Sequence, residues 1–171
     1  MTDLRRHIRE ILDFPKPGIV FKDITPLLAN AEAFRETIDA LVAPYRHRVD
    51  IVLGIDSRGF IIGAAAAYAL GTGLAIVRKR GKLPHETFAA SYELEYGTDS
   101  LEIHRDALGP EHRVVLIDDL LATGGTASAA LDLVRRCGGQ VVGCGFVIEL
   151  ASLRGRERLR GHEVTSLIRY D

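Results

Sequence analysis

Two neighbouring carboxylates precede a glycine-rich turn in the segment VVLIDDLLATGGT, residues 114–126. Consecutive glycines let the backbone curl tightly, and the free N–H groups at the start of a helix favour an anion. An ordinary strand-to-helix turn is the alternative interpretation, because glycine marks turns of every kind. Neither the GxxxxGK[ST] loop nor the GxGxxG fingerprint occurs, so the turn does not indicate a polyphosphate or dinucleotide site. It predicts a cradle for one phosphate group, made of Ala122, Thr123, Gly124, Gly125 and Thr126.

The two carboxylates, Asp118 and Asp119, would repel a phosphate unless they face another partner. Sugar hydroxyls donate hydrogen bonds to carboxylates, and Mg²⁺ binds them through water. A turn with a solvated charge is the alternative interpretation. Because both acids stand at the tip of a buried apolar run, they favour a role in binding. The acids and the turn together predict a site for a phosphorylated sugar.

Two further polar segments follow apolar runs: DSRG after residues 50–55 and RKRGK after residues 74–77. Ser57 does not fit the GxSxG pattern of hydrolases, because it stands three residues after Gly54. Arg58 and the backbone around it are better suited to bind an anion at a helix start. The RKRGK run could be a solvated or nucleic-acid-binding surface. Its position directly after a buried run favours a small, multiply charged anion instead.

The alternation of strand and helix patterns supplies a scaffold that would bring these segments together. Continuous apolar strands separated by helices indicate an α/β fold with a parallel sheet covered on both faces. Ligands bind such sheets beyond the carboxyl ends of the strands, so the three polar segments are expected at one edge. The patterns predict strands at residues 50–55, 74–77, 114–117, 140–149 and 163–168, and helices at 31–42, 59–70 and 126–137.

The remaining segments are less regular. Residues 4–12 have helical apolar spacing and predict a short amphipathic helix, and the prolines of residues 13–26 predict an irregular, exposed segment. Between Arg78 and Arg113 the alternation lapses, which indicates a lid or binding loop. Within it, SYELEYG fits either an exposed β-hairpin or a lid on which Glu93 or Glu95 acts as acid and base.

Composition excludes several protein classes. The 171 residues, 47% hydrophobic and 26% charged, are typical of one globular domain. A net charge of −1 gives no general attraction to nucleic acid or to a membrane surface. The longest apolar stretch, residues 59–77, is broken by four glycines and predicts a buried helix and strand rather than a membrane span. Cys137 and Cys144 lack metal-site spacing, and the N-terminus lacks a signal core, so we expect a reduced, cytoplasmic protein.

Taken together, the motifs resemble the phosphoribosyl-pyrophosphate (PRPP) signature of the type I phosphoribosyltransferases. DFPKPGIVFKDITPLL, GIDSRGF, RKRGKLP, YELEYGTDSLEIH and ELASLRGRERL are similar to segments of the adenine phosphoribosyltransferase family. The resemblance implies the type I phosphoribosyltransferase fold, a central and mostly parallel sheet flanked by helices, in a single domain of residues 1–171. It also implies an N-terminal hood that binds adenine, residues 1–30, and a flexible catalytic loop, residues 80–104.

The resemblance implies a role for each matching residue. The ATGGT segment would bind the 5′-phosphate of PRPP or AMP, and Asp118 and Asp119 would meet the ribose hydroxyls. Glu95 matches the acid/base residue of the family, which decides between the two glutamates. His85 replaces the usual glycine of KLPG, which bears on loop flexibility and not on the chemistry. Pyrophosphate is expected at Asp56, Ser57, Arg58, Arg78, Lys79 and Lys82, and adenine against the backbone of Val20, Phe21 and Lys22.

The implied reaction is a step of purine salvage, the transfer of the 5-phosphoribosyl group from PRPP to adenine, which gives AMP and pyrophosphate. Mg²⁺ is the implied cofactor, bound mainly through PRPP, pyrophosphate and water rather than by direct protein ligands. A cytoplasmic homodimer is expected from the family. Two alternatives stay open: transfer to another purine base, and a regulator that senses PRPP or a purine. The near-zero net charge argues against a regulator that binds nucleic acid.

Overall fold

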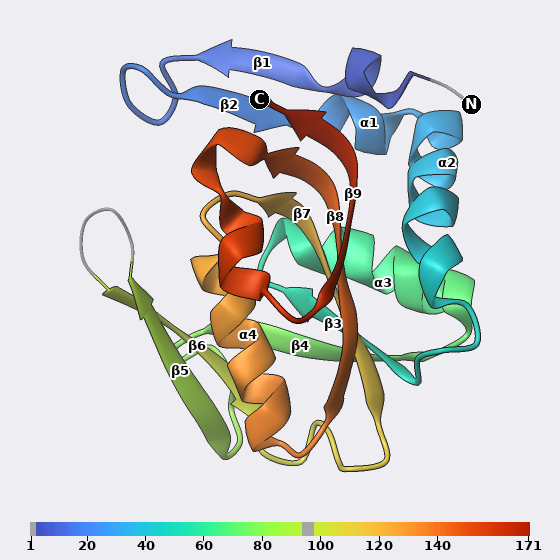
Figure 1. Ribbon diagram of the computed structural model, residues 1–171, viewed down its shortest axis with the longest axis vertical. Coiled ribbons are helices and arrows are strands. Elements are labelled where there is room, and N and C mark those ends of the chain that lie inside the picture. Colours follow the sequence, from blue (N-terminus) through green and yellow to red (C-terminus); the bar gives the residue numbers. More distant parts are fainter. Residues whose placement is uncertain (1–2, 94–97) are drawn as a thin grey trace.

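The computed structural model describes residues 3–93 and 98–171 and is built around a seven-stranded sheet (Figure 1). The strand order is β5-β6-β4-β3-β7-β8-β9. The strands from β4 to β9 in this order run parallel, and β6 and β5 add an antiparallel edge. All five predicted strands are therefore confirmed as the parallel part of the sheet. Their bounds are β3 Ile51–Ile55, β4 Gly73–Lys79, β5 Thr87–Glu93, β6 Thr98–His104, β7 Arg113–Leu121, β8 Gln140–Leu150 and β9 Glu163–Tyr170.

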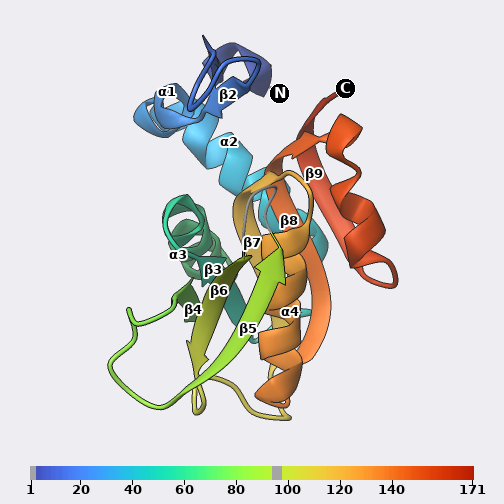
Figure 2. The same cartoon turned by 90° about the vertical axis from the view of Figure 1, so that its left-hand side faces the viewer.

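Helices cover both faces of this sheet, as predicted. Figure 2 shows α3 on one side of the sheet and α4 on the other. The Asn30 side chain caps the start of α2 by accepting from the N–H of Ala33 at 2.9 Å. Gly71, with φ +68°, ends α3 in the left-handed conformation that glycine adopts most easily. The helix bounds are α1 Thr25–Ala29, α2 Ala31–Val42, α3 Arg58–Leu70 and α4 Gly125–Arg136.

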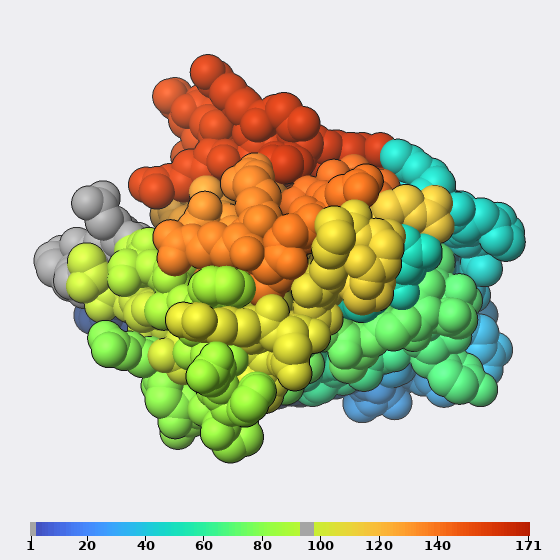
Figure 3. Space-filling model, turned by 90° about the horizontal axis from the view of Figure 1, so that it is seen from below, coloured from blue at the N-terminus to red at the C-terminus, as the bar shows by residue number. Residues whose placement is uncertain are grey.

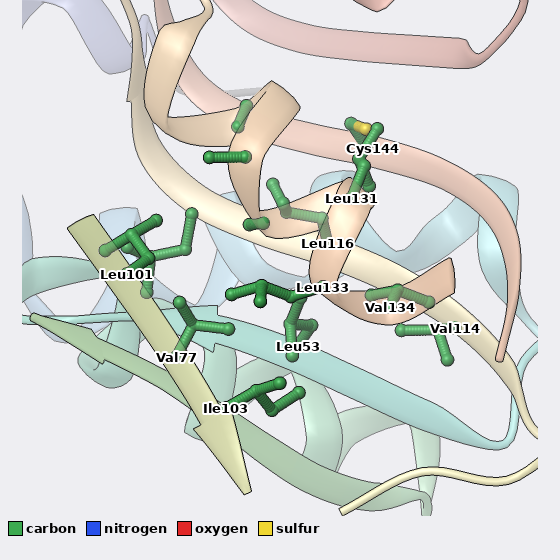
Figure 4. Close-up of a cluster of buried hydrophobic side chains, with 14 of the residues drawn as sticks. Leu53, Val77, Leu101, Ile103, Val114, Leu116, Leu131, Leu133, Val134 and Cys144 are labelled. Atoms are coloured by element: carbon green, nitrogen blue, oxygen red, sulfur yellow. The ribbon is translucent and has the colours of Figure 1, made fainter. Parts of the chain in front are cut away.

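Two buried apolar clusters lie on the two faces of the sheet. Successive strand residues point to opposite faces, so Val52 packs with the α2 and α3 cluster and Leu53 with the α4 cluster. Figure 4 shows Leu53 and Leu116 close to Leu133 of α4. The apolar stretch 59–77 forms α3 and β4, as predicted, and no helix in the described part of the chain is long and apolar enough to cross a membrane.

The N-terminal segment differs from its prediction. Residues 4–12 form a 3₁₀ helix, η1 (Leu4–His7), and a strand, β1 (Arg9–Leu12), instead of one amphipathic helix. The strand β1 pairs with β2 (Val20–Asp23), so part of the expected irregular segment is also regular. The apolar residues that were spaced for one helix face are also compatible with a strand. In the structure Ile11, one of them, lies opposite Phe21 of β2. Pairing with the other strand of the hairpin, which the spacing within residues 4–12 does not encode, decided the outcome.

Two further boundaries differ from the prediction. The lapse between Arg78 and Arg113 contains the hairpin β5–β6, which is the β-hairpin alternative for SYELEYG, and its strands extend the sheet. The third predicted strand, β7, runs on through both aspartates to Leu121. It continues because β8 pairs with it there, with Asp118 opposite Phe146. At the other end of the sheet the loop before β7 meets the start of β8 at the surface, where Gln140 Nε2 donates to Pro110 O at 2.9 Å (Figure 3).

Candidate active site

A hollow of about 330 Å³ opens at the carboxyl ends of β3 and β7. One wall is the turn from β3 into α3, and the other is the end of β7 with the turn into α4. The strands β3 and β7 are adjacent and parallel in the sheet. They therefore bring DSR and DDLLATGGT together, although the two segments are far apart in the sequence. The lining residues are Ile55, Asp56, Ser57, Arg58, Asp118, Asp119, Leu120, Leu121, Ala122, Thr123, Gly124, Gly125, Thr126 and Ala127.

The predicted phosphate cradle is the turn between β7 and α4. Gly124, with φ +80°, adopts the left-handed conformation directly before the first residue of α4. No side chain in the described residues caps this helix start, and Ser128 is the first residue whose N–H bonds back to Gly124 O, at 2.9 Å. The amides of the first turn are thus left for a ligand, and the helix dipole favours an anion there.

The two carboxylates at the end of β7 have different surroundings. Arg58 Nε lies 2.8 Å from Asp119 Oδ2, and the N–H of Asp119 donates to Asp118 Oδ1 at 2.9 Å. Burial raises the pKa of Asp118, and the neighbouring Asp119 raises it further. Burial also raises the pKa of Asp119, and Arg58 opposes this increase. Two hydroxyl donors placed here would stabilise the charged carboxylates.

The basic run is divided between two partners. Arg78 Nε donates to Asp56 Oδ2 at 2.9 Å, which holds Arg78 beside the hollow. Lys79 Nζ lies 3.0 Å from Asp99 Oδ2 on β6 instead. Lys82 is exposed, and its carbonyl accepts from Arg78 at 3.3 Å. The structure therefore connects Arg78 to the hollow through Asp56 and does not place Lys79 or Lys82 among the lining residues.

The segment expected to face adenine lies on β2. The Phe21 ring centroid is 5.1 Å from the guanidinium carbon of Arg58, so the N-terminal hairpin touches a residue that lines the hollow. Val20 is 39% exposed. Lys22 Nζ pairs with Glu10 and lies 4.1 Å from the Tyr170 ring, so its side chain is held within the hairpin and the end of β9. Any contact of Lys22 with a base would come from its backbone.

Glu95 lies outside the described residues, in the sequence between β5 and β6. The strand residues that flank this segment are linked to the site. Tyr92 pairs with Asp99 across the hairpin, with the hydroxyl 3.3 Å from Oδ2. The Tyr92 hydroxyl also interacts with the Thr126 side chain in the cradle. The hairpin is therefore connected to the cradle through Tyr92 and to the basic run through Asp99.

The sequence of this chain is similar to that of one known protein family. Residues 22–168 match the family model of the phosphoribosyl transferase domain. A curated adenine phosphoribosyltransferase of Solibacter usitatus is 59% identical over 172 residues, which cover 100% of the chain and 99% of that protein. The chain belongs to the adenine phosphoribosyltransferase family.

Solved structures of the adenine phosphoribosyltransferase family have the same fold. The enzyme of Thermoanaerobacter pseudethanolicus superposes with a TM-score of 0.95 at 51% identity, over 98% of each chain. The enzyme of Saccharomyces cerevisiae superposes with a TM-score of 0.91 at 39% identity, over 96% of each chain. The yeast structure holds adenine and an imino-altritol bisphosphate. The predicted type I phosphoribosyltransferase fold is therefore confirmed.

Two groups of residues beside the cradle of this family member were not predicted from the sequence. Tyr92 lies within SYELEYG and Asp99 follows it, and the sequence pattern indicated a role there only for Glu93 or Glu95. Glu149 and Arg156 belong to ELASLRGRERL, which contributed only to the resemblance. A carboxylate near the end of a buried strand, followed within one turn-forming segment by an arginine, was the available signal for an ion pair.

Proposed function

We propose that this protein transfers the 5-phosphoribosyl group of PRPP to adenine and releases pyrophosphate, which makes AMP and serves purine salvage. The observation that carries the proposal is the pairing of a phosphate cradle with two carboxylates in one hollow at the carboxyl ends of β3 and β7. An anion site and a hydroxyl site side by side suit a ribose 5-phosphate group. Membership of the family indicates the two partners of the transfer.

The cradle and the acids would hold the sugar phosphate. The residues Ala122, Thr123, Gly124, Gly125 and Thr126 surround the 5′-phosphate with backbone N–H groups and hydroxyls. Asp118 and Asp119 accept from the ribose 2′- and 3′-hydroxyls. This arrangement leaves the anomeric carbon between the cradle and the turn after β3. Bond breaking there builds positive charge on the sugar, which the two carboxylates stabilise.

The leaving pyrophosphate would lie against the turn after β3 and the basic run. The hydroxyl of Ser57, the guanidinium groups of Arg58 and Arg78, and the amines of Lys79 and Lys82 donate to its oxygens, and Asp56 orients Arg78. In the structure Lys79 is bound to Asp99, so its part in this contact requires it to exchange that partner for pyrophosphate.

The site also suits Mg²⁺. The ion would bind mainly through phosphate oxygens of the substrate and through water, which are the hard oxygen ligands that Mg²⁺ prefers. Asp56, Asp118 and Asp119 supply the hard oxygen acceptors that would receive hydrogen bonds from its water ligands. When bound, the ion would neutralise charge on the leaving pyrophosphate.

The N-terminal hairpin and the hairpin β5–β6 would complete the site. Residues 1–30 act as a hood in which the backbone of Val20, Phe21 and Lys22 reads adenine. Residues 80–104 act as the catalytic loop and exclude water, which would otherwise attack the sugar. Glu95 accepts the proton that adenine loses as N9 bonds to the anomeric carbon.

The protein would work as a homodimer in the cytoplasm. An apolar surface on α3 and β4 supports the dimer, because Ile61, Tyr68 and Leu74 are 47%, 91% and 42% exposed. Clusters of exposed large apolar side chains mark interaction surfaces. This surface begins at Ile61, about one helical turn after Arg58 on the same helix, so a partner subunit would sit close to the site.

An assay of base specificity tests the proposal. With PRPP and Mg²⁺, we expect AMP from adenine and little product from guanine, hypoxanthine or xanthine. Glu95→Gln should lower kcat by about 10²–10⁴-fold and leave the affinity for PRPP nearly unchanged, because only acid–base catalysis is removed. Preferential turnover of another base would replace adenine as the substrate. Tight, salt-sensitive binding to DNA or RNA without turnover would favour a regulator instead.

A further inference from the structure

The turn after β8 packs against the back of the phosphate cradle. It consists of two short 3₁₀ helices, η3 (Ala151–Leu153) and η4 (Gly155–Leu159). A Cβ added to Gly155 would lie 2.3 Å from Ala122 O, and one added to Gly124 would lie 2.5 Å from Gly155 O. The two backbones are therefore in direct contact with no room for a side chain on either side. Any movement of Gly155 must move the cradle.

The next residue, Arg156, is fixed by a nearly buried carboxylate. Arg156 Nε lies 2.8 and 2.9 Å from the two carboxylate oxygens of Glu149, and Nη2 lies 2.8 Å from Oε2. Only 4% of the Glu149 side chain is exposed. Arg156 also donates to Val164 O at 2.9 Å and to Ser166 Oγ at 3.3 Å on β9. Such a fork-shaped ion pair sets position and angle as well as distance.

Glu149 itself is anchored in the sheet beside the cradle. It lies on β8 directly opposite Leu121, the last residue of β7. A rigid path therefore runs from the β7–β8 ladder through Glu149 and Arg156 to Gly155, and from Gly155 to Ala122. This path meets the cradle at Ala122, which follows Leu121 in the chain, and at Gly124, which packs against Gly155.

We propose that Glu149, Gly155 and Arg156 are positioning residues that fix the shape of the phosphate cradle from behind. The proposal rests on the proposed function, since it assigns the same cradle to the 5′-phosphate. None of the three lines the hollow. They act through the backbone of residues 122–124, whose amide groups must converge on one anion. A misplacement of these groups by a fraction of an ångström weakens several hydrogen bonds at once.

Arg156→Lys tests this role, with Arg160→Lys as the matched control on an exposed residue of the same segment. Lysine keeps the charge and loses the fork. We expect the Kd for ribose 5-phosphate and the KM for PRPP to rise about tenfold, which corresponds to about 1.4 kcal/mol. The KM for adenine should stay within about twofold in both variants. Calorimetric titration and initial rates measure these quantities.

Two further variants separate positioning from general loss of structure. Glu149→Gln keeps the shape of the side chain, and Gly155→Ala inserts a methyl group against Ala122 O; both should weaken ribose 5-phosphate binding and spare the KM for adenine. Gly73→Ala, where the nearest atom is 3.6 Å away, is the steric control. Unchanged ribose 5-phosphate binding in folded Arg156→Lys and Glu149→Gln would overturn the proposal. Equal losses for adenine and PRPP would also overturn it, since they indicate general disruption.

The same titration separates this inference from the proposed function. If the wild-type protein binds ribose 5-phosphate but makes no AMP from adenine, the choice of base is wrong and the positioning role can still be measured. If the wild-type protein makes AMP and the variants bind ribose 5-phosphate normally, only the positioning role fails.

Discussion

At the scale of single residues, the surroundings of Asp118 disfavour the charged form of its carboxyl group. Its carboxylate is buried beside a second carboxylate, and both factors raise its pKa above the usual 3.8. Gly59 also allows close approach of α3, because an added Cβ there would lie 2.5 Å from Asp118 Oδ1. Side chains whose surroundings lower the stability of the folded protein are typical of binding sites, where a ligand supplies the missing partner.

This arrangement predicts opposite effects of Asp118→Asn on stability and binding. When the pKa of a carboxyl is raised in the folded state, the protein loses stability as the pH rises through that pKa. A neutral Asn does not titrate, so the variant avoids this loss of stability at pH 7. Its amide oxygen can still accept from the N–H of Asp119. We expect a higher Tm, by roughly 2–4 °C for each kcal/mol gained, in thermal unfolding. Ribose 5-phosphate should bind about 10–100-fold more weakly, because a hydrogen bond to a charged group is lost.

Asp119→Asn is the control, since it also weakens the contact with Arg58 at 2.8 Å. It should therefore stabilise the protein less than Asp118→Asn does. A lower Tm for Asp118→Asn at pH 7 would contradict the electrostatic explanation.

At the scale of elements, the hairpin β5–β6 is attached to the basic run by strand pairing between β6 and β4 and by a side-chain ion pair. Asp99 on β6 binds Lys79 at the end of β4 and receives the Tyr92 hydroxyl. The Lys79 side chain is 63% exposed, and exposed ion pairs contribute at most about 1 kcal/mol. The pair is thus weak enough to exchange when a more highly charged anion arrives.

Asp99→Asn is predicted to free Lys79 for pyrophosphate. The affinity for pyrophosphate should rise several-fold, because Lys79 no longer has to leave a carboxylate first. Thermal stability should change little, in keeping with the weak pair. Lys79→Met is the opposite control and should lower the affinity. Product inhibition by pyrophosphate measures both, and an unchanged inhibition constant in both variants would remove Lys79 from the pyrophosphate site.

At the scale of the whole molecule, the two ends of the chain meet above the sheet. Figure 1 shows the N-terminal hairpin beside the end of β9. Arg5 donates to the carbonyl of Arg169, and Lys22 lies over the Tyr170 ring. The hairpin that would cover adenine is therefore fixed by the last strand. Ion pairs hold other segments in place. Arg48 and Glu163 join the segment before β3 to the start of β9, and Glu149 and Arg156 fix the turn after β8 behind the cradle.

These ion pairs predict how stability depends on pH. Arg156 lowers the pKa of Glu149, and Arg48 lowers that of Glu163, from the usual 4.5. A carboxyl with a lowered folded pKa stabilises the protein above the unfolded value and loses this contribution as the pH falls through the folded value. We expect Tm to fall below about pH 4.5. Glu149→Gln should flatten this fall more than Glu163→Gln, because Glu149 is more deeply buried; equal profiles would contradict this ranking.

The sequence alone determined the parallel strands, the helices between them and the glycine-rich turn from β7 into α4. Continuous apolar runs and glycine pairs are signals that can be read locally. In a parallel sheet the carboxyl ends of the strands lie at the same edge, so segments that follow these strands are expected close together. The meeting of the DSR and DDLLATGGT segments at the ends of β3 and β7 could therefore be predicted from the sequence. The same reasoning failed for residues 4–12, where a helical spacing gave way to pairing between Ile11 and Phe21.

Only the tertiary structure decided which partners the charged residues choose. Lys79 binds Asp99 rather than facing the hollow, and Arg156 reaches Glu149 behind the cradle. Long side chains have several carboxylates within reach, and the packing of the surrounding segments selects the partner. Spacing along the chain offered a signal only for Arg156, which stands 7 residues after Glu149. The sequence therefore shows which residue types the site contains. The positions of their side chains depend on the segments that pack around the site.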